Sequence, residues 1–329
     1  MYYQIEQVLE TYGLGDAQTY KGRGVLVCEK NHELWALKEF QGSQEKGEFL
    51  YLLGGYLAEQ GIVNDRPKKN REGELITEGP DGIRYIMHQW YKGRECDVKN
   101  RMDILMTVSH LARFHSAVRG FSCGEETLAY RKESVLSEYS RHNRELIKIR
   151  NYIRKRKQKN DFERLFTKCF SDFFEQCLKV EEALQMAEEK EITGKTGICH
   201  GDFNQHNILF RAADPVMIHF EKAKYGVQIA DFGNFMRKIM EKYNWEESLG
   251  TAMLEEYHRV NPLNRGDFLQ LYYRLSYPEK FWKIANHYYG SNKVWISNRN
   301  LEKLQKEIHQ HKSRCRYLTG LLEALNKEV

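Results

Sequence analysis

Residues 198–210 read ICHGDFNQHNILF, and this stretch decides how the chain folds. His200, Gly201 and Asp202 stand together, Asn207 follows after four further residues, and an apolar run begins directly behind it. The pattern H-G-D-x-x-x-x-N therefore places a carboxylate and an amide in one loop that ends on a short strand. A string of this length rarely arises by chance, although a polar loop around a buried aspartate is the structural alternative.

The spacing matches the protein-kinase catalytic loop H-R-D-x-x-x-x-N, with glycine in place of arginine. Phosphoryl transfer to a hydroxyl requires a carboxylate at the incoming hydroxyl and oxygen ligands for Mg²⁺ near the phosphates. Asp202 is placed for the first role and Asn207 for the second. We therefore predict His200 and Asp202 as catalytic positions and Asn207 as a metal ligand.

The rest of the chain predicts an α+β, two-lobed, protein-kinase-like fold. Short alternating segments at 18–21, 25–28 and 34–40, a helix around Phe49 and a strand at 83–89 precede helical patterns at 104–115, about 127–159 and 162–189. We expect three parts: an antiparallel-sheet N-terminal lobe (1–89), a linker (90–93) and a mainly helical C-terminal lobe (94–329).

Composition excludes several classes of protein. No run of about 18 apolar residues exists, so no membrane span is expected, and the N-terminus lacks the pattern of a signal peptide. Seven scattered cysteines without CxxC pairs favour synthesis in a reducing cytoplasm. The net charge of +5 is too mild to indicate nucleic acid. The basic run at 148–159 keeps a helical apolar stripe and predicts a solvated helix end, with an anionic surface as the alternative.

The nucleotide side of the site is less well marked. Lys38 lies on the third predicted strand, where a kinase-like fold keeps its phosphate-pairing lysine. A helix carboxylate would orient it, and we predict Glu48 in that role, with Glu45 as the alternative. Gly22 and Gly24 do not form G-x-G-x-x-G, so we expect a tight hairpin that offers few backbone N–H groups to phosphate.

A second metal ligand is sought in the hairpin behind the loop. If Phe210 faces Val216 across antiparallel strands, residue 219 lies opposite Asn207, and that residue is His219. Imidazole brings no negative charge to a cation that prefers oxygen ligands, so Mg-nucleotide affinity should fall. Glu221, two residues further on, would lie on the same face and compensate in part. Zinc bound by His200, His206 and His219 is a weaker alternative.

Asp231-Phe232-Gly233 has the letters of the kinase D-F-G motif but precedes an amphipathic stripe through Phe235 and Met236. We interpret Asp231 as a helix N-cap, whose side chain accepts backbone N–H groups of the first turn. The second metal ligand is therefore expected in the hairpin and not at Asp231.

Residues 200–207 (HGDFNQHN) resemble the catalytic loop of the aminoglycoside phosphotransferase and choline kinase superfamily, and 111–115 (LARFH) resembles the helix ahead of that loop. More closely, 199–202 (CHGD), 235–238 (FMRK) and 277–282 (YPEKFW) resemble CotS-type spore coat proteins. The resemblance aligns 217–221 (MIHFE) with an I-D-F-E strand, which implies His219 at the metal-aspartate position and Asp231 as a structural aspartate. It also implies ATP and Mg²⁺ as cofactors, other spore coat proteins as partners, and synthesis in the mother-cell cytoplasm.

Two functions remain open at this point. The first is a kinase-fold spore coat protein with a structural or assembly role, catalytically degenerate at its metal site and binding neither ATP nor Mg²⁺ well. The second is an active ATP-dependent phosphotransferase acting on a small hydroxylated molecule or a sugar. The identity of such an acceptor is not readable from the sequence, and nucleic-acid binding ranks behind both.

Overall fold

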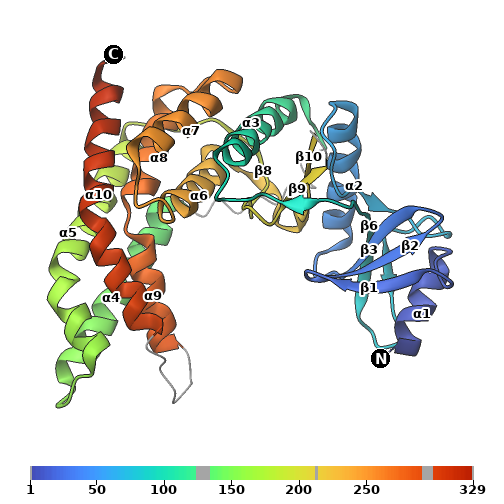
Figure 1. Cartoon of the computed structure of the whole chain (residues 1–329), viewed down its shortest axis with the longest axis horizontal. Helices are drawn as coiled ribbons and strands as arrows, with labels where there is room; N and C mark the ends of the chain where they lie inside the picture. The colour runs from blue at the N-terminus through green and yellow to red at the C-terminus, as the bar shows by residue number, and fades with distance from the viewer. Residues whose placement is uncertain (1, 124–133, 212–213, 291–298, 328–329) are drawn as a thin grey trace. The chain divides into compact units, whose positions relative to one another are not determined.

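The structure is a computed structural model that describes residues 2–123, 134–211, 214–290 and 299–327 (Figure 1). It divides into two compact units, each built from separate stretches of chain. The first draws on 1–130, 196–231 and 253–262, and the second on 131–195, 232–252 and 263–329. An antiparallel sheet near the N-terminus and mainly helices after it confirm the predicted α+β class. The predicted lobe boundary at 90–93 stays a prediction.

The main sheet lies in the first unit and has the order β1-β2-β3-β6-β4, with β5 pairing β6. All of its pairs are antiparallel, and the strands predicted from sequence alternation are confirmed. The turn between β1 and β2 holds only Arg23 and Gly24, so the predicted tight hairpin is confirmed as well. The strand bounds are β1 Gln18–Gly22, β2 Val25–Lys30, β3 Glu33–Glu39, β4 Pro67–Lys68, β5 Ile76–Glu78 and β6 Arg84–Gln89.

The two faces of this sheet are covered differently. Helix α1 (Tyr2–Thr11) packs Val8 and Leu9 against the face that carries Leu37 and Met87, and Tyr12, directly after the helix, joins the same cluster. Helix α2 (Gln44–Glu59) lies beside the opposite face (Figure 1), and its N-terminus is capped by the Ser43 side chain, which accepts the Lys46 N–H. The face that looks away from α1 carries the polar residues of the candidate site.

The remainder of the first unit supplies the loop that holds the H-G-D pattern. Helix α3 (Arg101–Ala117) and a short 3₁₀ turn (Val118–Gly120) precede it in the chain. Two small antiparallel sheets, of order β10-β9-β7 and β11-β8, flank the loop. Their bounds are β7 Arg94–Glu95, β8 Thr196–Cys199, β9 Ile208–Arg211, β10 Asp214–Met217 and β11 Lys224–Val227, with a 3₁₀ turn at Phe220–Lys222.

The second unit is helical, and aromatic side chains fill its core. Phe166 and Phe173 of α5 stack on Phe281 of α9, with ring centroids 5.0 and 4.6 Å apart. Asn160 and Glu163 form a capping box that begins α5. Among the described residues, the remaining helices are α4 Val135–Lys155, α5 Asp161–Glu189, α6 Ile229–Met240, α7 Glu247–Val260, α8 Arg265–Ser276, α9 Glu279–Gly290 and α10 Arg299–Lys327.

The basic run at 148–159 covers the end of α4 and the turn into α5. Ile149 and Ile153 are buried, and Arg156 pairs with the buried Glu163. The prediction of a helix end with an apolar stripe is therefore confirmed, although residues 127–133 of the predicted helix lie outside the described residues. Among the residues that the structure describes, none of the helices combines the length and hydropathy of a membrane span.

Candidate functional site

The loop that carries the H-G-D pattern runs from β8 to β9 and is anchored by Asp231. The Asp231 carboxylate accepts the backbone N–H of His200 at 2.6 Å and that of Gly201 at 3.1 Å. His115 contacts the same carboxylate through Nε2 at 3.3 Å and bonds the Tyr257 hydroxyl through Nδ1 at 2.7 Å. Burial alone would raise the pKa of Asp231, but the hydrogen bonds with His115 and with the backbone N–H of His200 help to outweigh it, and that pKa lies below its usual range.

The prediction that Asp231 is not a metal ligand agrees with this arrangement, but its expected contact was wrong. Asp231 lies inside the first turn of α6, which begins at Ile229, and its carboxylate binds the loop rather than the helix. Buried backbone N–H groups must find an acceptor, and here a side chain distant in sequence supplies it.

Gly201 is required by the backbone itself. It adopts φ +80°, and a β-carbon there would lie 2.1 Å from the carbonyl oxygen of Lys222. Only glycine occupies such a position without strain. The glycine that replaces the kinase arginine is thus explained by the close approach of the 3₁₀ turn at Phe220–Lys222.

We expect Gly201→Ala to destabilise the protein by at least about 3 kcal/mol, because the left-handed strain is joined by a backbone collision. Gly24→Ala is the matched control, since Gly24 has φ +69° with nothing within 4 Å of an added β-carbon. The control should lose only about 1 kcal/mol, the strain contribution alone. Urea unfolding measures both losses, and equal losses would show that the Lys222 carbonyl gives way.

His200 positions the loop and does not face solvent. Its ring is fully buried, its Nε2 contacts the Ile218 carbonyl at 3.0 Å, and its Nδ1 lies 3.3 Å from the Asp202 N–H. The tautomer that donates from Nε2 and accepts at Nδ1 satisfies both contacts. The structure therefore places the predicted catalytic position His200 as a brace between the loop and the following hairpin.

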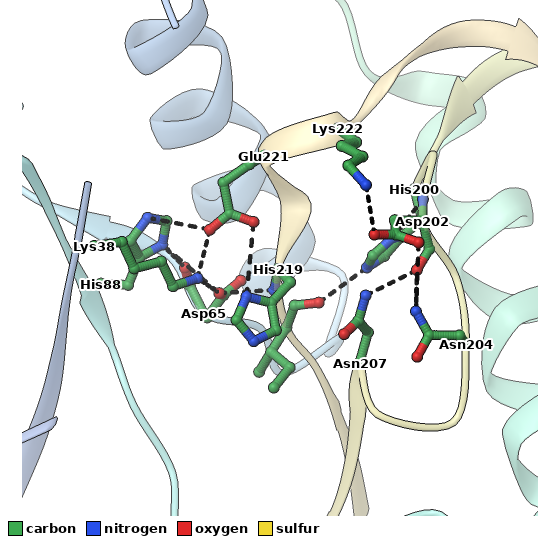
Figure 2. A network of polar contacts seen from close by, with 11 residues as sticks. Lys38, Asp65, His88, His200, Asp202, Asn204, Asn207, His219, Glu221 and Lys222 are labelled. Atoms are coloured by element: carbon green, nitrogen blue, oxygen red, sulfur yellow. Dashed lines mark hydrogen bonds and ion pairs between the residues drawn. The ribbon is translucent and has the colours of Figure 1, made fainter. Parts of the chain in front are cut away.

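Asp202 and Asn207 lie together, as the spacing predicts. The side-chain amides of Asn207 and Asn204 each donate to the Asp202 carbonyl at 2.8 Å, which fixes the loop around them. Figure 2 shows the Asn207 amide nitrogen turned toward Asp202 and its oxygen turned away. The Asp202 carboxylate is 39% exposed and pairs with the Lys222 ammonium at 2.9 Å.

Lys38 sits at the centre of a buried ionic cluster. Its Nζ lies 2.7 Å from Asp65 Oδ2 and 2.5 Å from Glu221 Oε1, and the Lys38 and Asp65 side chains are 5% and 0% exposed. Burial lowers the pKa of Lys38, but its two carboxylates raise it more, so the lysine stays charged. Burial would raise the pKa of Glu221, yet Lys38 draws it down to about 2.

The prediction that Glu48 orients Lys38 is wrong, and so is its alternative, Glu45. Both glutamates are exposed on α2, whereas the partners of Lys38 are Asp65 and Glu221. Asp65 comes from the loop behind α2, so a search confined to helix carboxylates missed it. A polar Asn-Asp pair between an apolar helix and a strand was the available signal.

His88 completes this cluster from β6. Its Nδ1 lies 2.6 Å from the Asp65 carbonyl, and its buried Nε2 has no hydrogen-bond partner among the described residues. Burial and the neighbouring Lys38 lower the pKa of His88 to about 4, so the ring is neutral at pH 7 and donates from Nδ1. Asp65, His88 and Glu221 have the donor types of a metal site, but the Lys38 ammonium bonds two of the three.

The predicted hairpin register is off by one residue. Phe210 pairs with Pro215 rather than Val216, and the Ile218 N–H bonds the Asn207 carbonyl at 3.0 Å, so Ile218 lies opposite Asn207. His219 follows in the left-handed conformation, with φ +69° and ψ +52°. The strand ends before His219 because the chain turns there into the 3₁₀ segment, and alternation along a strand no longer applies.

His219 nevertheless lies at the site. Its backbone N–H donates to Asp65 Oδ2 at 2.8 Å, and its ring lies between the Lys38 cluster and Asn207 (Figure 2). The Nδ1 of His219 is 3.8 Å from Glu221 Oε2. Burial first, and Lys38 second, lower the pKa of His219, which leaves a neutral imidazole beside Asn207 at pH 7. His219 therefore lies near Asn207, as predicted, but in a left-handed backbone conformation and not on a continuing strand.

Comparison with known proteins now places the chain in a family. The family model described as "Spore coat putative kinase YutH" matches residues 5–321. The chain belongs to this spore coat kinase family. The resemblance to CotS-type spore coat proteins is thereby confirmed.

Solved structures share the fold of this spore coat kinase family member. An aminoglycoside phosphotransferase from Alicyclobacillus acidocaldarius is 19% identical with a TM-score of 0.82, covering 97% of this chain and 95% of that one. A spectinomycin phosphotransferase in complex with ADP and spectinomycin is 14% identical, with a TM-score of 0.60 and 98% of each chain covered. An amicoumacin kinase in complex with AMP-PNP and Ca²⁺ is 12% identical, with a TM-score of 0.61, covering 94% and 93%. The kinase-like fold predicted from the sequence is confirmed.

Charges in the site of this spore coat kinase family member are balanced. Lys38 bonds Asp65 and Glu221, and Lys222 bonds Asp202. A third lysine, Lys46 of α2, reaches the same region: its ammonium donates to the Ala223 carbonyl, and burial lowers its pKa to about 8 while Glu221 opposes the shift. The carboxylates of the site therefore already have cationic neighbours from the protein itself.

Proposed function

We propose that the chain is a kinase-fold component of the spore coat with a structural or assembly role, and that its metal site is catalytically degenerate. The observation that supports this proposal most strongly is that the carboxylates of the site form ion pairs with lysines. Lys38 holds Glu221 and Asp65, and Lys222 holds Asp202. A divalent cation would have to displace a buried ammonium that is bonded to two anions.

The donors available around Asn207 do not fit Mg²⁺. This ion prefers oxygen ligands in a near-octahedral shell, with carboxylates supplying charge. Asn207 offers one neutral oxygen, His219 offers a neutral imidazole, and the Glu221 carboxylate is taken by Lys38. In this proposal Asp202 and Asn207 organise the loop by hydrogen bonds.

The alternative is an active ATP-dependent phosphotransferase acting on a small hydroxylated molecule or a sugar. It is favoured by the partly exposed Asp202 carboxylate and by the Asn207 amide oxygen, which is turned away from the loop. The named relatives that contain ADP or AMP-PNP support ATP as the nucleotide in that case. Asp202 would then be the base, Lys38 the phosphate clamp, and Asn207 with Glu221 the metal ligands, which requires Glu221 to leave Lys38.

Calorimetric titration of ATP, with and without Mg²⁺, separates the two proposals. We expect the wild type to show no tightening by Mg²⁺, whereas His219→Asp, which adds a carboxylate beside Asn207, should gain about tenfold or more. His219→Asn is the matched control, because it has the shape of the aspartate without its charge, and it should behave like the wild type. Tight, Mg²⁺-dependent ATP binding by the wild type would overturn the degenerate site.

The role in the coat is tested separately, by a variant of Asp202. The family supports synthesis in the mother cell and other spore coat proteins as partners. If the role is structural, Asp202→Asn restores coat assembly as fully as the wild type in an endospore-forming strain that lacks the protein. Loss of assembly with a variant that is folded and present at normal levels would favour the phosphotransferase.

A further inference from the structure

One face of the main sheet leads from the ionic cluster to an aromatic side chain. Ala36 pairs with His88 across β3 and β6, and the Trp90 N–H donates to the Leu34 carbonyl at 2.9 Å, which continues the same ladder by two residues. Directly paired residues share a face, and alternate residues return to it. Trp90 therefore lies on the face that carries Ala36, His88 and Lys38.

The Trp90 indole packs between two apolar clusters of the first unit. On one side are sheet residues that include Val27 and Ala36, and on the other are hairpin residues that include Leu209 and Ile218. The ring centroid is 5.8 Å from Lys38 Nζ and 5.8 Å from the centroid of the His219 ring. The indole thus fills an apolar slot between the two clusters, and this slot adjoins Lys38 and His219.

A nucleotide bound at this site would need that slot. The lysine of the third strand contacts phosphates in kinase-like sites, and the loop asparagine holds their metal, so the phosphates belong between Lys38 and Asn207. The base must lie beyond them, between flat apolar surfaces that exclude water. Indole and purine are both fused bicyclic rings of nearly the same size, so Trp90 has the shape of the ligand it would displace.

We propose that Trp90 sets the ligand specificity of this cleft by occupying the slot for a purine base, so that the wild-type protein rejects adenosine and a gain such as that expected of His219→Asp comes from the phosphates alone. The inference rests on the proposed function only in treating the cleft as the nucleotide-type site, and it concerns the base, not the metal. Truncation of Trp90 opens the slot to adenine.

A hollow next to Trp90 would give a ligand access to the opened slot. Trp90 also lines a hollow of about 410 Å³, together with Leu34, Tyr91 and Lys92. Removal of the indole joins this hollow to the space between the two apolar clusters. A cavity with apolar walls binds flat aromatic molecules when its filling side chain is removed.

The test is calorimetric titration with adenosine, which has no phosphates and therefore needs no metal. We expect no detectable binding of adenosine by the wild type. Trp90→Ala should bind adenosine with an affinity at least about tenfold above the detection limit that is set by the wild type. Indole is the second probe, and it should raise the melting temperature of Trp90→Ala. Trp90→Leu is measured in parallel, because it leaves part of the apolar filling and keeps the fold if the alanine variant unfolds; it should bind adenosine more weakly than Trp90→Ala but more tightly than the wild type.

Trp35→Ala is the matched control, since Trp35 lines the same hollow but packs with the cluster on the α1 face and not with the two clusters around Trp90. It loses an indole outside the slot and should bind neither adenosine nor indole. Adenosine binding by the wild type as tight as by Trp90→Ala would overturn the proposal, and so would a folded Trp90→Ala that binds indole but not adenosine. Neither result depends on Mg²⁺, so failure here is distinguishable from failure of the degenerate metal site.

Discussion

Asp65→Asn should cost the protein about 3–5 kcal/mol of its free energy of unfolding, because it withdraws one anion from a buried lysine. Lys38 is 5% exposed and its ammonium lies 2.7 Å from Asp65 Oδ2, so the positive charge would remain buried with Glu221 alone. The same carboxylate oxygen accepts the His219 N–H. Asparagine keeps the shape and one acceptor, so the loss reports mainly the charge. Urea unfolding at pH 7 measures it.

Asp16→Asn is the matched control, because the Asp16–Lys30 pair is formed at the surface. It should leave the free energy of unfolding nearly unchanged, since exposed pairs are screened by water. Lys38→Met in the Asp65→Asn background should recover part of the loss, because it removes the charge that the first substitution stranded. Equal losses of unfolding free energy for Asp65→Asn and Asp16→Asn would contradict the claim that Asp65 stabilises a buried charge. The same holds if the effects of Asp65→Asn and Lys38→Met on the free energy of unfolding simply add in the double variant.

Acidification from pH 6.5 to pH 4 should destabilise the protein by about 3 kcal/mol for each of two buried histidines. Burial and Lys38 lower the pKa of His88 to about 4, and burial and Arg113 lower that of His110 to about 4. A group with a depressed folded-state pKa stabilises the native state above its unfolded value, and that stabilisation is lost as pH falls toward the folded value. Stability should therefore be constant above about pH 6.5 and fall below it.

Glu221 extends the same trend to lower pH. Its folded-state pKa of about 2 lies below the ordinary value of a glutamate, so its contribution is present above about pH 4.5 and lost as pH falls further. Urea unfolding across this range gives the proton uptake from the slope. His88→Asn and His110→Asn should each reduce the slope between pH 6.5 and 4 by about one proton. An unchanged slope in both variants would show that neither imidazole is held neutral.

The fold could be predicted well from the sequence, but the candidate site could be predicted only in part. The H-G-D-x-x-x-x-N pattern and the alternation of apolar residues located the loop and the strands of the sheet, because both depend on local spacing. The partners of Lys38 depend on distant segments: Asp65 comes from the loop behind α2, and Glu221 from a 3₁₀ turn far along the chain. Helical periodicity around Glu48 could not reveal that a loop carboxylate lies closer.

The hairpin shows a different limit. Counting across the ladder assumed that the second strand continues through residue 219, but the strand ends at Met217 and His219 turns into the left-handed region. A histidine in the left-handed conformation is uncommon, and the residues around His219 in the sequence do not predict it. The indole of Trp90 was also missed, since its role follows from two apolar clusters that meet only in three dimensions.

The structural roles of the residues in the H-G-D pattern affect what a sequence search for this pattern detects. Of the three letters H-G-D, the first is a buried brace to the Ile218 carbonyl and the second is imposed by a turn with no room for a β-carbon. Only Asp202 presents a group that could meet a substrate. Two of these three letters therefore report backbone structure, so a chain can match the pattern fully even when its site no longer supports phosphoryl transfer. A filter for active members of such families should weigh the residue at the position of His219 above the signature itself.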